Sequence, residues 1–413
     1  MKNIFHHPYF AISRRRFLKL VSFLGAGLFL NPLQKIFPPK AYAAESDPVV
    51  LSVYNDALTD WAYPGFDSNG VPNGQRQQDA QGRYYYDSVN QIAVKNTIDK
   101  GIMQLTGKTT PAQAWISLLT GYQPEHRVAI KINWNGIWDM MDAERPSLES
   151  IKETTNSVIQ GLIDAGIPKN QIFVGDASRT LPGNTGPYYK SVHPDINWVT
   201  KSCPDTQHKD FAVNNSSARV AFTGPDAGQE KYIANFIVDS EHLINIYLLK
   251  NHNGGITGAF KNHFGSVYNC ETLHATINTE GYSCLAHIGR NSHIHTKTRL
   301  CIADAIFGCW VENEEPRPFK TLSMNSPKRM FFSKDPVALD SVLLNFMEWE
   351  ITERSLWWPN HFWMDYIHTN YPELGHHDHW NNSTEKQYAN INFQEISMNN
   401  AIPDAPGKLR ITG

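Results

Sequence analysis

Short apolar runs recur along the chain and alternate with longer segments in which apolar side chains return every three or four residues. The short runs are rich in Val, Ile, Leu and Phe, a composition typical of strands that are buried on both faces of a parallel sheet. They predict strands at residues 49–53, 128–133, 172–175, 243–249, 299–304 and 330–332.

The longer segments predict amphipathic helices, because their apolar residues fall on one stripe. Ser, Thr and Asp are the residues that cap helix starts, and Pro is favoured in the first turn. The predicted helices cover 89–102 after Asp87-Ser88, a segment from Thr110-Pro111, 147–162 between Pro146-Ser147 and Gly166, and 337–349 after Asp335-Pro336.

The order of these elements predicts the fold class. A strand, a helix and a second strand within residues 128–175 are typical of a right-handed parallel crossover. Residues 61–86 and 180–230 are rich in Gly, Asn, Pro and Ser, which favour turns. The sequence therefore predicts an α/β fold over residues 44–413: one domain with a mostly parallel sheet, flanking helices and long loops.

Residues 1–43 are predicted to be a signal peptide. Residues 13–19, Ser-Arg-Arg-Arg-Phe-Leu-Lys, form a twin-arginine pattern, and the apolar run at 20–30 that follows is too short to span a bilayer. Ala41 and Ala43 supply the small residues of a cleavage site. We expect the twin-arginine machinery to export the chain to the periplasm, with no membrane anchor after cleavage. The alternative is an uncleaved amphipathic anchor.

Charge and cysteine content exclude two classes of protein. The formal net charge is −3, and the predicted signal peptide contains basic but no acidic residues, so the mature chain is more acidic still. Such a chain, without a basic stripe, is not expected to bind nucleic acid. The five cysteines include no Cys-x-x-Cys pair, which excludes ferredoxin-type iron–sulfur motifs. An oxidising periplasm permits disulfides, although Cys301 and Cys309 fit equally well as small buried residues.

The stretch at residues 242–265 is the strongest candidate for a functional site. Its apolar run ends at Lys250, Asn251 and His252, and a Gly-rich turn then leads to Lys261 and Asn262. In open α/β sheets, ligands bind beyond the carboxyl ends of the strands, where this polar cluster would lie. The alternative is a Gly-rich surface loop with solvated lysines.

Other predicted strands carry polar residues at the same end, namely Lys131, Asn133 and Asp176, although Lys131 could instead lie at a sheet edge. Three lysines that met there would suit a carboxylate or a phosphate, and amides of Gly254, Gly255 and Gly258 could bind the same anion. We therefore predict a site with these roles: Lys250 and His252 catalytic, the latter as general acid or base; Asp176 or Asp340 orienting; and Lys131, Asn133, Lys261, Asn262, Gly255 and Thr257 binding substrate.

Further carboxylates and histidines have several interpretations. Asp335 is most simply a helix N-cap, whereas Asp340 and Asp304 could pair with the lysines. A divalent metal could bind His252, His263 and a nearby Asp, but no compact ligand spacing supports it. The tract at 376–379, His-His-Asp-His, could hold a transition metal, although a solvated loop is the simpler interpretation.

Three segments resemble the domain of unknown function 362 family. They are Val-Ala-Ile-Lys-Ile-Asn at 128–133, Leu-Lys-Asn-His at 249–252 with Thr-Gly-Ala-Phe-Lys-Asn at 257–262 and Gly265, and Ser-Lys-Asp-Pro-Val-Ala-Leu-Asp at 333–340. The resemblance covers residues 127–385. It implies no settled activity. Many relatives carry ferredoxin-type cysteine clusters, which this chain lacks, so their iron–sulfur role is not carried over.

Three functions fit these observations. The first is an exported enzyme that acts on a small anionic substrate in a Lys/His/Asp pocket. The second is a periplasmic redox or metal-cofactor protein, because twin-arginine export often carries proteins with cofactors already inserted. The third is a non-catalytic binding protein for an anionic solute. The density of Lys, His and Asp residues at strand ends favours the first.

Overall fold

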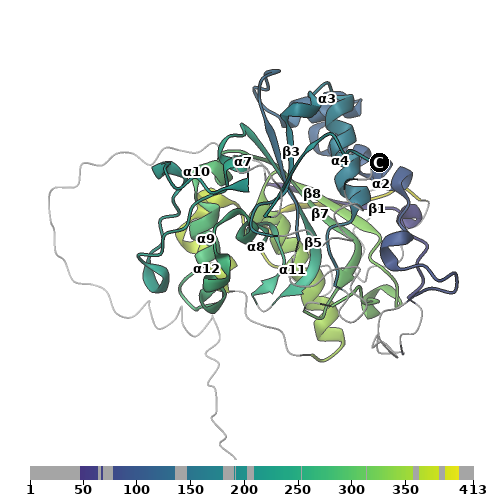
Figure 1. Ribbon diagram of the computed structural model, residues 1–413. Helices are drawn as coiled ribbons and strands as arrows, with labels where there is room; N and C mark the ends of the chain where they lie inside the picture. The colour runs from purple at the N-terminus through teal and green to yellow at the C-terminus, as the bar shows by residue number, and fades with distance from the viewer. Residues whose placement is uncertain are drawn as a thin grey trace, which may run out of the picture. The chain divides into compact units, whose positions relative to one another are not determined.

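A computed structural model describes residues 47–63, 67, 78–134, 147–179, 190, 192–201, 209–252, 254–312, 314–356, 362–380 and 387–399. A mixed sheet runs through this part of the chain, with helices on both faces (Figure 1). Its strands are β1 Val49–Tyr54, β2 Val128–Lys131, β3 Ile172–Asp176, β4 Asn197–Thr200, β5 His242–His252, β6 Gly255–Ile256, β7 Thr298–Cys309, β8 Arg329–Ser333 and β9 Asn392–Ser397.

The strand order is β4-β3-β2-β5-β7-β8-β1-β9, and β6 pairs with the end of β5. The strands from β4 to β7 are parallel neighbours, β8 is antiparallel to both β7 and β1, and β9 is parallel to β1. This arrangement confirms the predicted α/β class with a mostly parallel sheet. It also brings the carboxyl ends of β2, β3 and β5 to one edge.

Side chains on the sheet alternate between two hydrophobic layers, as the pleat requires. In β5, Ile244 and Ile246 pack with one set of helices, whereas Leu243 and Tyr247 pack with the other. Full burial of such a side chain contributes about 1.5–3 kcal/mol. The helices are α2 Gln91–Thr106, α3 Pro111–Leu118 and α4 Lys152–Asp164 on one face, and α7 Asn235–Val238, α8 Ala259–Asn262, α9 Cys284–Gly289, α10 Ser292–His295, α11 Pro336–Glu353 and α12 Phe362–Asn370 on the other.

Two predicted helix caps are confirmed, and one is wrong. The side chains of Thr110 and Asp335 accept hydrogen bonds from the first-turn amides of α3 and α11. The cap of α2 is Asn90, which accepts from the amides of Ile92 and Ala93, rather than Asp87-Ser88. The predicted helix start at Ser147 is also wrong. Residues 147–150 have no regular secondary structure, and their amides donate to other segments, as when the Ser150 amide donates to the carbonyl of Asn133.

Strand β5 is longer than predicted, which changes the setting of the central stretch. Lys250, Asn251 and His252 belong to the strand instead of following it. Asn251 and His252 pair antiparallel with β6, so Gly254 lies in the turn of a short hairpin and Gly255 belongs to its second strand. The predicted strand at 299–304 likewise extends to Cys309, and β4, β6 and β9 were not predicted.

The remaining predictions about the chain fall partly outside the described residues. The predicted signal peptide and Cys203 lie outside them. The other cysteines, including Cys301 and Cys309, are free and buried, as expected for small core residues. Among the described helices, none has both the length and the apolar composition needed to cross a membrane.

Candidate functional site

The carboxyl ends of β2, β3 and β5 carry most of the predicted site residues. Lys131 and Asp176 are the last residues of β2 and β3, and Lys250 lies near the end of β5. Helix α8 approaches this edge, and the side-chain amide of Asn262 donates a hydrogen bond to the carbonyl of Ile246 in β5. Residues distant in sequence therefore meet at one place.

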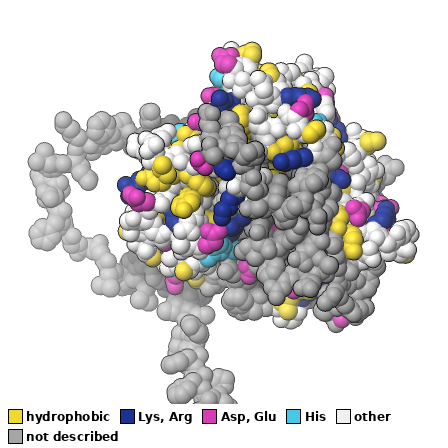
Figure 2. Space-filling model, viewed as in Figure 1, with side chains coloured by type: hydrophobic (Ala, Val, Ile, Leu, Met, Phe, Trp, Pro, Cys, Tyr) yellow, Lys and Arg dark blue, Asp and Glu magenta, His cyan; other side chains and the backbone are white. Residues whose placement is uncertain are grey.

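These elements enclose a cavity of about 260 Å³, a size that suits a small molecule. Basic, acidic and histidine side chains lie close together on this face, over the region of α8 (Figure 2). The lining residues are Asn133, Trp134, Asp176, Arg179, Lys250, His252, Thr257, Lys261, Asn262, Phe264, Gly265, Glu271, His274 and Glu312. Of the predicted site residues, Lys131, Gly255 and Asp340 are not among those that line it.

Lys131 lies behind the cavity wall and bonds to protein groups. Its Nζ is 2.9 Å from Oδ2 of Asp176, and the two side chains are 0% and 2% exposed. The same ammonium donates to Oδ1 of Asn262 at 3.0 Å and to the carbonyl of Ile132 at 2.7 Å. Burial lowers the pKa of Lys131, and Asp176 opposes this shift. The expectation that this lysine faces the ligand is therefore wrong, since internal acceptors surround its ammonium.

Asn133 extends this network. Its Nδ2 donates to the Oδ1 of Asn262 that also accepts from Lys131. Asp176 accepts from the amide and hydroxyl of Ser178. Gly265 packs directly against Asp176. A Cβ at this position would lie 1.8 Å from Oδ2 of Asp176, so the close approach requires glycine. The network fixes the position of α8 against the sheet.

Lys250 and Lys261 line the cavity, and neither forms an ion pair with a carboxylate in the part of the chain that is described. Lys250 is 4% exposed, and its Nζ donates to the carbonyl of Leu148 at 3.1 Å. Nζ of Lys261 lies 4.1 Å from the centre of the Phe264 ring. Burial lowers the pKa of Lys261 to about 8, and the charges of Arg179 and Lys250 add to this shift.

His252 is held as a neutral imidazole. Burial lowers its pKa well below the usual value, and the positive charge of Lys261 adds to this effect. Its Nδ1 accepts a hydrogen bond from the amide of Gly254 at 3.1 Å, so the neutral ring carries its hydrogen on Nε2. Nε2 lies 3.7 Å from Oε1 of Glu312. This tautomer offers a hydrogen-bond donor, which argues against the predicted role as a general base.

Asp340 has a different place from the one predicted. Its carboxylate accepts hydrogen bonds from the amides of Ala259 (2.7 Å) and Phe260 (3.4 Å), at the start of α8. Burial raises the pKa of Asp340 to about 7, although these amides oppose the shift. A Cβ at Gly258 would lie 2.5 Å from this carboxylate, which explains the glycine. The amides that bind Asp340 are not the predicted glycine amides, and the amide of Gly254 donates to His252 instead.

Asp304 and His263 also have internal partners. Asp304 accepts from the Thr154 hydroxyl and the Ile306 amide rather than from a lysine. The two ring nitrogens of His263 face the side chains of Asn245 and Ser266. His252 and His263 are not part of a common metal-binding group among the described residues, so the structure does not support the metal site predicted there.

Several lining residues were not predicted. Arg179 and Glu271 form an ion pair at the rim, and His274 lies with its ring centre 5.8 Å from that of His252. Arg179 follows Asp176 by three residues, a signal that could have identified it. Glu271 lies in a short 3-10 helix, Cys270–Thr276, and Glu312 lies in a turn. Neither segment has a distinguishing sequence pattern, so only the fold brings these residues to the cavity.

Comparison with known families identifies the chain. A family model described as a domain of unknown function, DUF362, matches residues 128–345, more than half of the chain. The chain belongs to the DUF362 family. All residues that line the cavity lie within the DUF362 match, which ends before the boundary at 385 that the resemblance predicted. No curated protein matches the chain.

Proposed function

We propose that this DUF362 protein is an enzyme that acts on a small carboxylate or phosphate bound between Lys250 and Lys261. The observation that supports this most is the presence of two ammonium groups in one cavity without a carboxylate partner among the described residues. A buried charge without a partner costs several kcal/mol, and the two groups also repel each other. A bound anion would remove both costs.

Two polar atoms in the cavity wall add support. The hydroxyl oxygen of Thr257 and the amide oxygen of Asn133 are buried and have no hydrogen-bond partner among the described residues. Buried polar groups usually have a partner, so such atoms in a cavity wall favour a polar ligand. The Thr257 hydroxyl can donate to an anion, and Oδ1 of Asn133 can accept from a ligand hydroxyl.

The environments of the lining residues suggest separate roles. Lys250 would bind the anion. Lys261 would exchange a proton with the substrate, because a lysine with a pKa near 8 is present in both protonation states near neutral pH. His252 would donate a hydrogen bond from Nε2. Asp176 would act indirectly, by holding Lys131 and hence Asn262 in place.

Anion binding is expected to weaken as the pH rises through 8. The ammonium of Lys261 is present below its pKa and is lost above it, whereas His252 stays neutral over this range. We expect the association constant of a small carboxylate to fall about tenfold between pH 7 and pH 9.5, the value of one charged hydrogen bond. Calorimetry with a panel of carboxylates measures this. A carboxylate is preferred to phosphate because its own charge is constant there.

The outcomes separate the candidate functions. If no small anion binds, or binding is the same at both pH values, the proposed ligand class is wrong. If an anion binds and nuclear magnetic resonance detects no conversion of any binding compound, the protein is a non-catalytic binding protein. The variant Lys261→Met is expected to bind weakly at both pH values, which assigns the pH dependence to this lysine.

Export remains a separate part of the proposal. The sequence pattern at 13–19 and the following apolar run support delivery to the periplasm by the twin-arginine machinery. Replacement of Arg14 and Arg15 by lysine is expected to leave the uncleaved precursor in the cytoplasm, as measured by cell fractionation and immunoblotting. Unchanged delivery of the double variant would contradict this pathway, and a retained N-terminus on the exported protein would contradict cleavage.

A further inference from the structure

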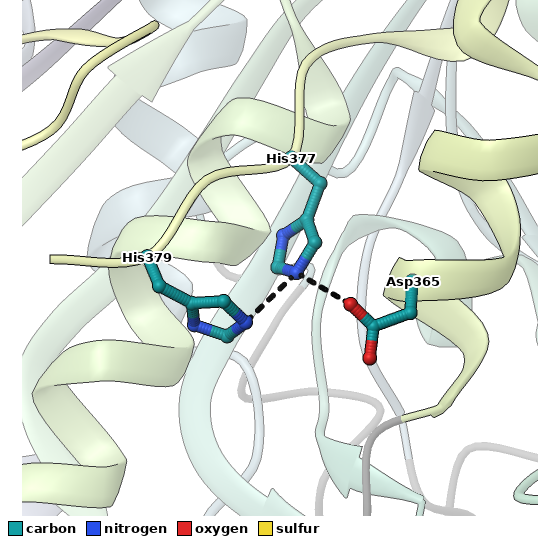
Figure 3. A group of neighbouring side chains, drawn as sticks. All are labelled: Asp365, His377 and His379. Atoms are coloured by element: carbon teal, nitrogen blue, oxygen red, sulfur yellow. Dashed lines mark hydrogen bonds and ion pairs between the residues drawn. The ribbon is translucent and has the colours of Figure 1, made fainter. Parts of the chain in front are cut away.

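A second group of chemically active side chains lies outside the cavity. Asp365 on α12 and the histidines 377 and 379 in the following segment point toward one another (Figure 3). One potential ligand atom from each residue lies within 4.8 Å of the other two. We propose that Asp365, His377 and His379 bind a divalent transition-metal ion, with Zn²⁺ as the ion that fits best. The three residues lie beyond the DUF362 match.

The distances agree with those of a metal site. Nε2 of His377 lies 3.1 Å from Nε2 of His379 and 3.6 Å from Oδ1 of Asp365. Bonds of about 2.0–2.2 Å to a tetrahedral zinc ion place neighbouring ligand atoms about 3.3–3.5 Å apart. These two distances are close to that spacing, and the ligand atoms of His379 and Asp365 lie within 4.8 Å of each other, so an ion can be bound once these two side chains rotate toward it.

The protein orients the ring of His377 as metal-binding histidines are oriented. The Ser341 hydroxyl donates its hydrogen to the carbonyl of Val337, so its oxygen accepts from Nδ1–H of His377 at 2.7 Å. This bond leaves the lone pair of Nε2 directed at the group. A hydrogen bond from the second ring nitrogen to a fixed acceptor sets the tautomer of metal ligands in the same way.

A second buried side chain lies against His379. Nδ2 of Asn345 is 3.5 Å from Nδ1 of this histidine, and the Asn345 side chain is buried on α11. Oδ1 of Asn345 has no hydrogen-bond partner among the described residues. Rotation of the amide would let this oxygen accept a hydrogen from Nδ1 of His379, in exchange for the hydrogen bond of 3.3 Å that Nδ2 donates to Glu348. Nε2 of His379 would then be able to bind the ion.

The solvated loop predicted for residues 376–379 is wrong for His377, which is buried at 6% exposure. The neighbouring residues of the tract are held elsewhere. His376 bonds to Asp335, and the Asp378 carboxylate accepts from the amides of Ala389 and Asn390. These contacts fix the backbone on both sides of His377. Hydrogen bonds of the neighbouring residues therefore hold the two histidines close to Asp365.

The ligand types indicate the class of metal. Two imidazole nitrogens and one carboxylate suit Zn²⁺ and similar transition-metal ions, whereas Ca²⁺ and Mg²⁺ prefer oxygen ligands. Three protein ligands leave a fourth position for water or another small ligand. Since the carboxylate of Asp365 is 65% exposed, the ion can enter from solvent.

Titration with CoCl₂ tests the proposal, because Co²⁺ replaces Zn²⁺ and its visible absorption reports the ligand geometry. The full chain, purified without a histidine tag and treated with EDTA, is expected to bind one equivalent. Asp365→Asn and His379→Gln are each expected to lower the affinity at least tenfold and to alter the spectrum. Ser341→Ala is expected to lower it about tenfold, as for other groups that orient a ligand.

The variant His376→Gln is the matched control, since it removes an imidazole from the same tract but not from the group. Its affinity and spectrum are expected to equal those of the unchanged protein. Equal weakening by His376→Gln, or no binding of Co²⁺ or Zn²⁺ at micromolar concentrations, would overturn the proposal. A direct hydrogen bond between the two histidines would then explain their contact. Thermal unfolding without metal identifies any variant that has lost its fold.

Discussion

Replacing Lys131 with methionine is expected to lower the free energy of unfolding by about 3–5 kcal/mol, the cost of breaking a buried ion pair by removing one partner. Methionine keeps the length of the side chain, so little cavity volume is created. It leaves the Asp176 carboxylate, 2% exposed, without its cation. It also removes the donor to Oδ1 of Asn262, which positions α8. Denaturant unfolding followed by circular dichroism measures the change.

The double variant Lys131→Met/Asp176→Asn is the control for this prediction. Asparagine removes the negative charge and still has an oxygen that can accept from the Ser178 amide. We expect it to recover at least half of the lost stability, because the buried charge without a partner is gone. A double variant that is as unstable as the single one would show that packing, rather than the ion pair, makes Lys131 necessary.

Replacing Lys250 with methionine is expected to have the opposite pattern of effects. Binding of a small anion should weaken about 10- to 100-fold, because a hydrogen bond to a charged group contributes about 1.5–3 kcal/mol. The free energy of unfolding should stay the same or rise. Loss of the hydrogen bond to Leu148 costs about 1 kcal/mol, but removal of a buried charge that repels Lys261 offsets it. Calorimetry and denaturant unfolding measure the two quantities.

The matched control is Lys108→Met, which removes the same charge from an exposed position between α2 and α3. Neither binding nor stability is expected to change. If Lys250→Met loses as much stability as Lys131→Met, then Lys250 has an internal role and the cavity is not built for an anion. Lys131 and Lys250 can be compared directly because both are buried and lie on adjacent parallel strands.

The contrast between these lysines illustrates how a site can oppose stability. Lys131 has Asp176 as its partner, whereas Lys250 and Lys261 have no carboxylate partner among the described residues. Buried charged side chains without a partner are common in binding and active sites, because a bound ligand then supplies the missing interaction. The proposed substrate anion would play this part, and the pH dependence of its binding reports on Lys261.

The apolar pattern by itself determined the fold class and the positions of β1, β2, β3, β5, β7 and β8. Aliphatic and aromatic residues dominate each of them, as expected for a strand buried on both faces, although single polar residues such as Ser52 and Asn245 occur within β1 and β5. The caps at Thr110 and Asp335 were equally readable, since a cap depends on residues within one turn. The sequence also placed Lys131, Asp176 and Lys250 at one sheet edge, because parallel strands end on the same side.

Only the tertiary structure decided which charged groups are partners. The sequence predicted the same orienting role for Asp176 and Asp340. In the structure, Asp176 pairs with Lys131, whereas Asp340 binds the amides at the start of α8. The convergence of His377 and His379 on Asp365 was likewise invisible, because it depends on how α12 packs. Hydrogen bonds and ion pairs require atoms to meet within a few tenths of an ångström. Local sequence patterns carry no information about such distances between remote segments.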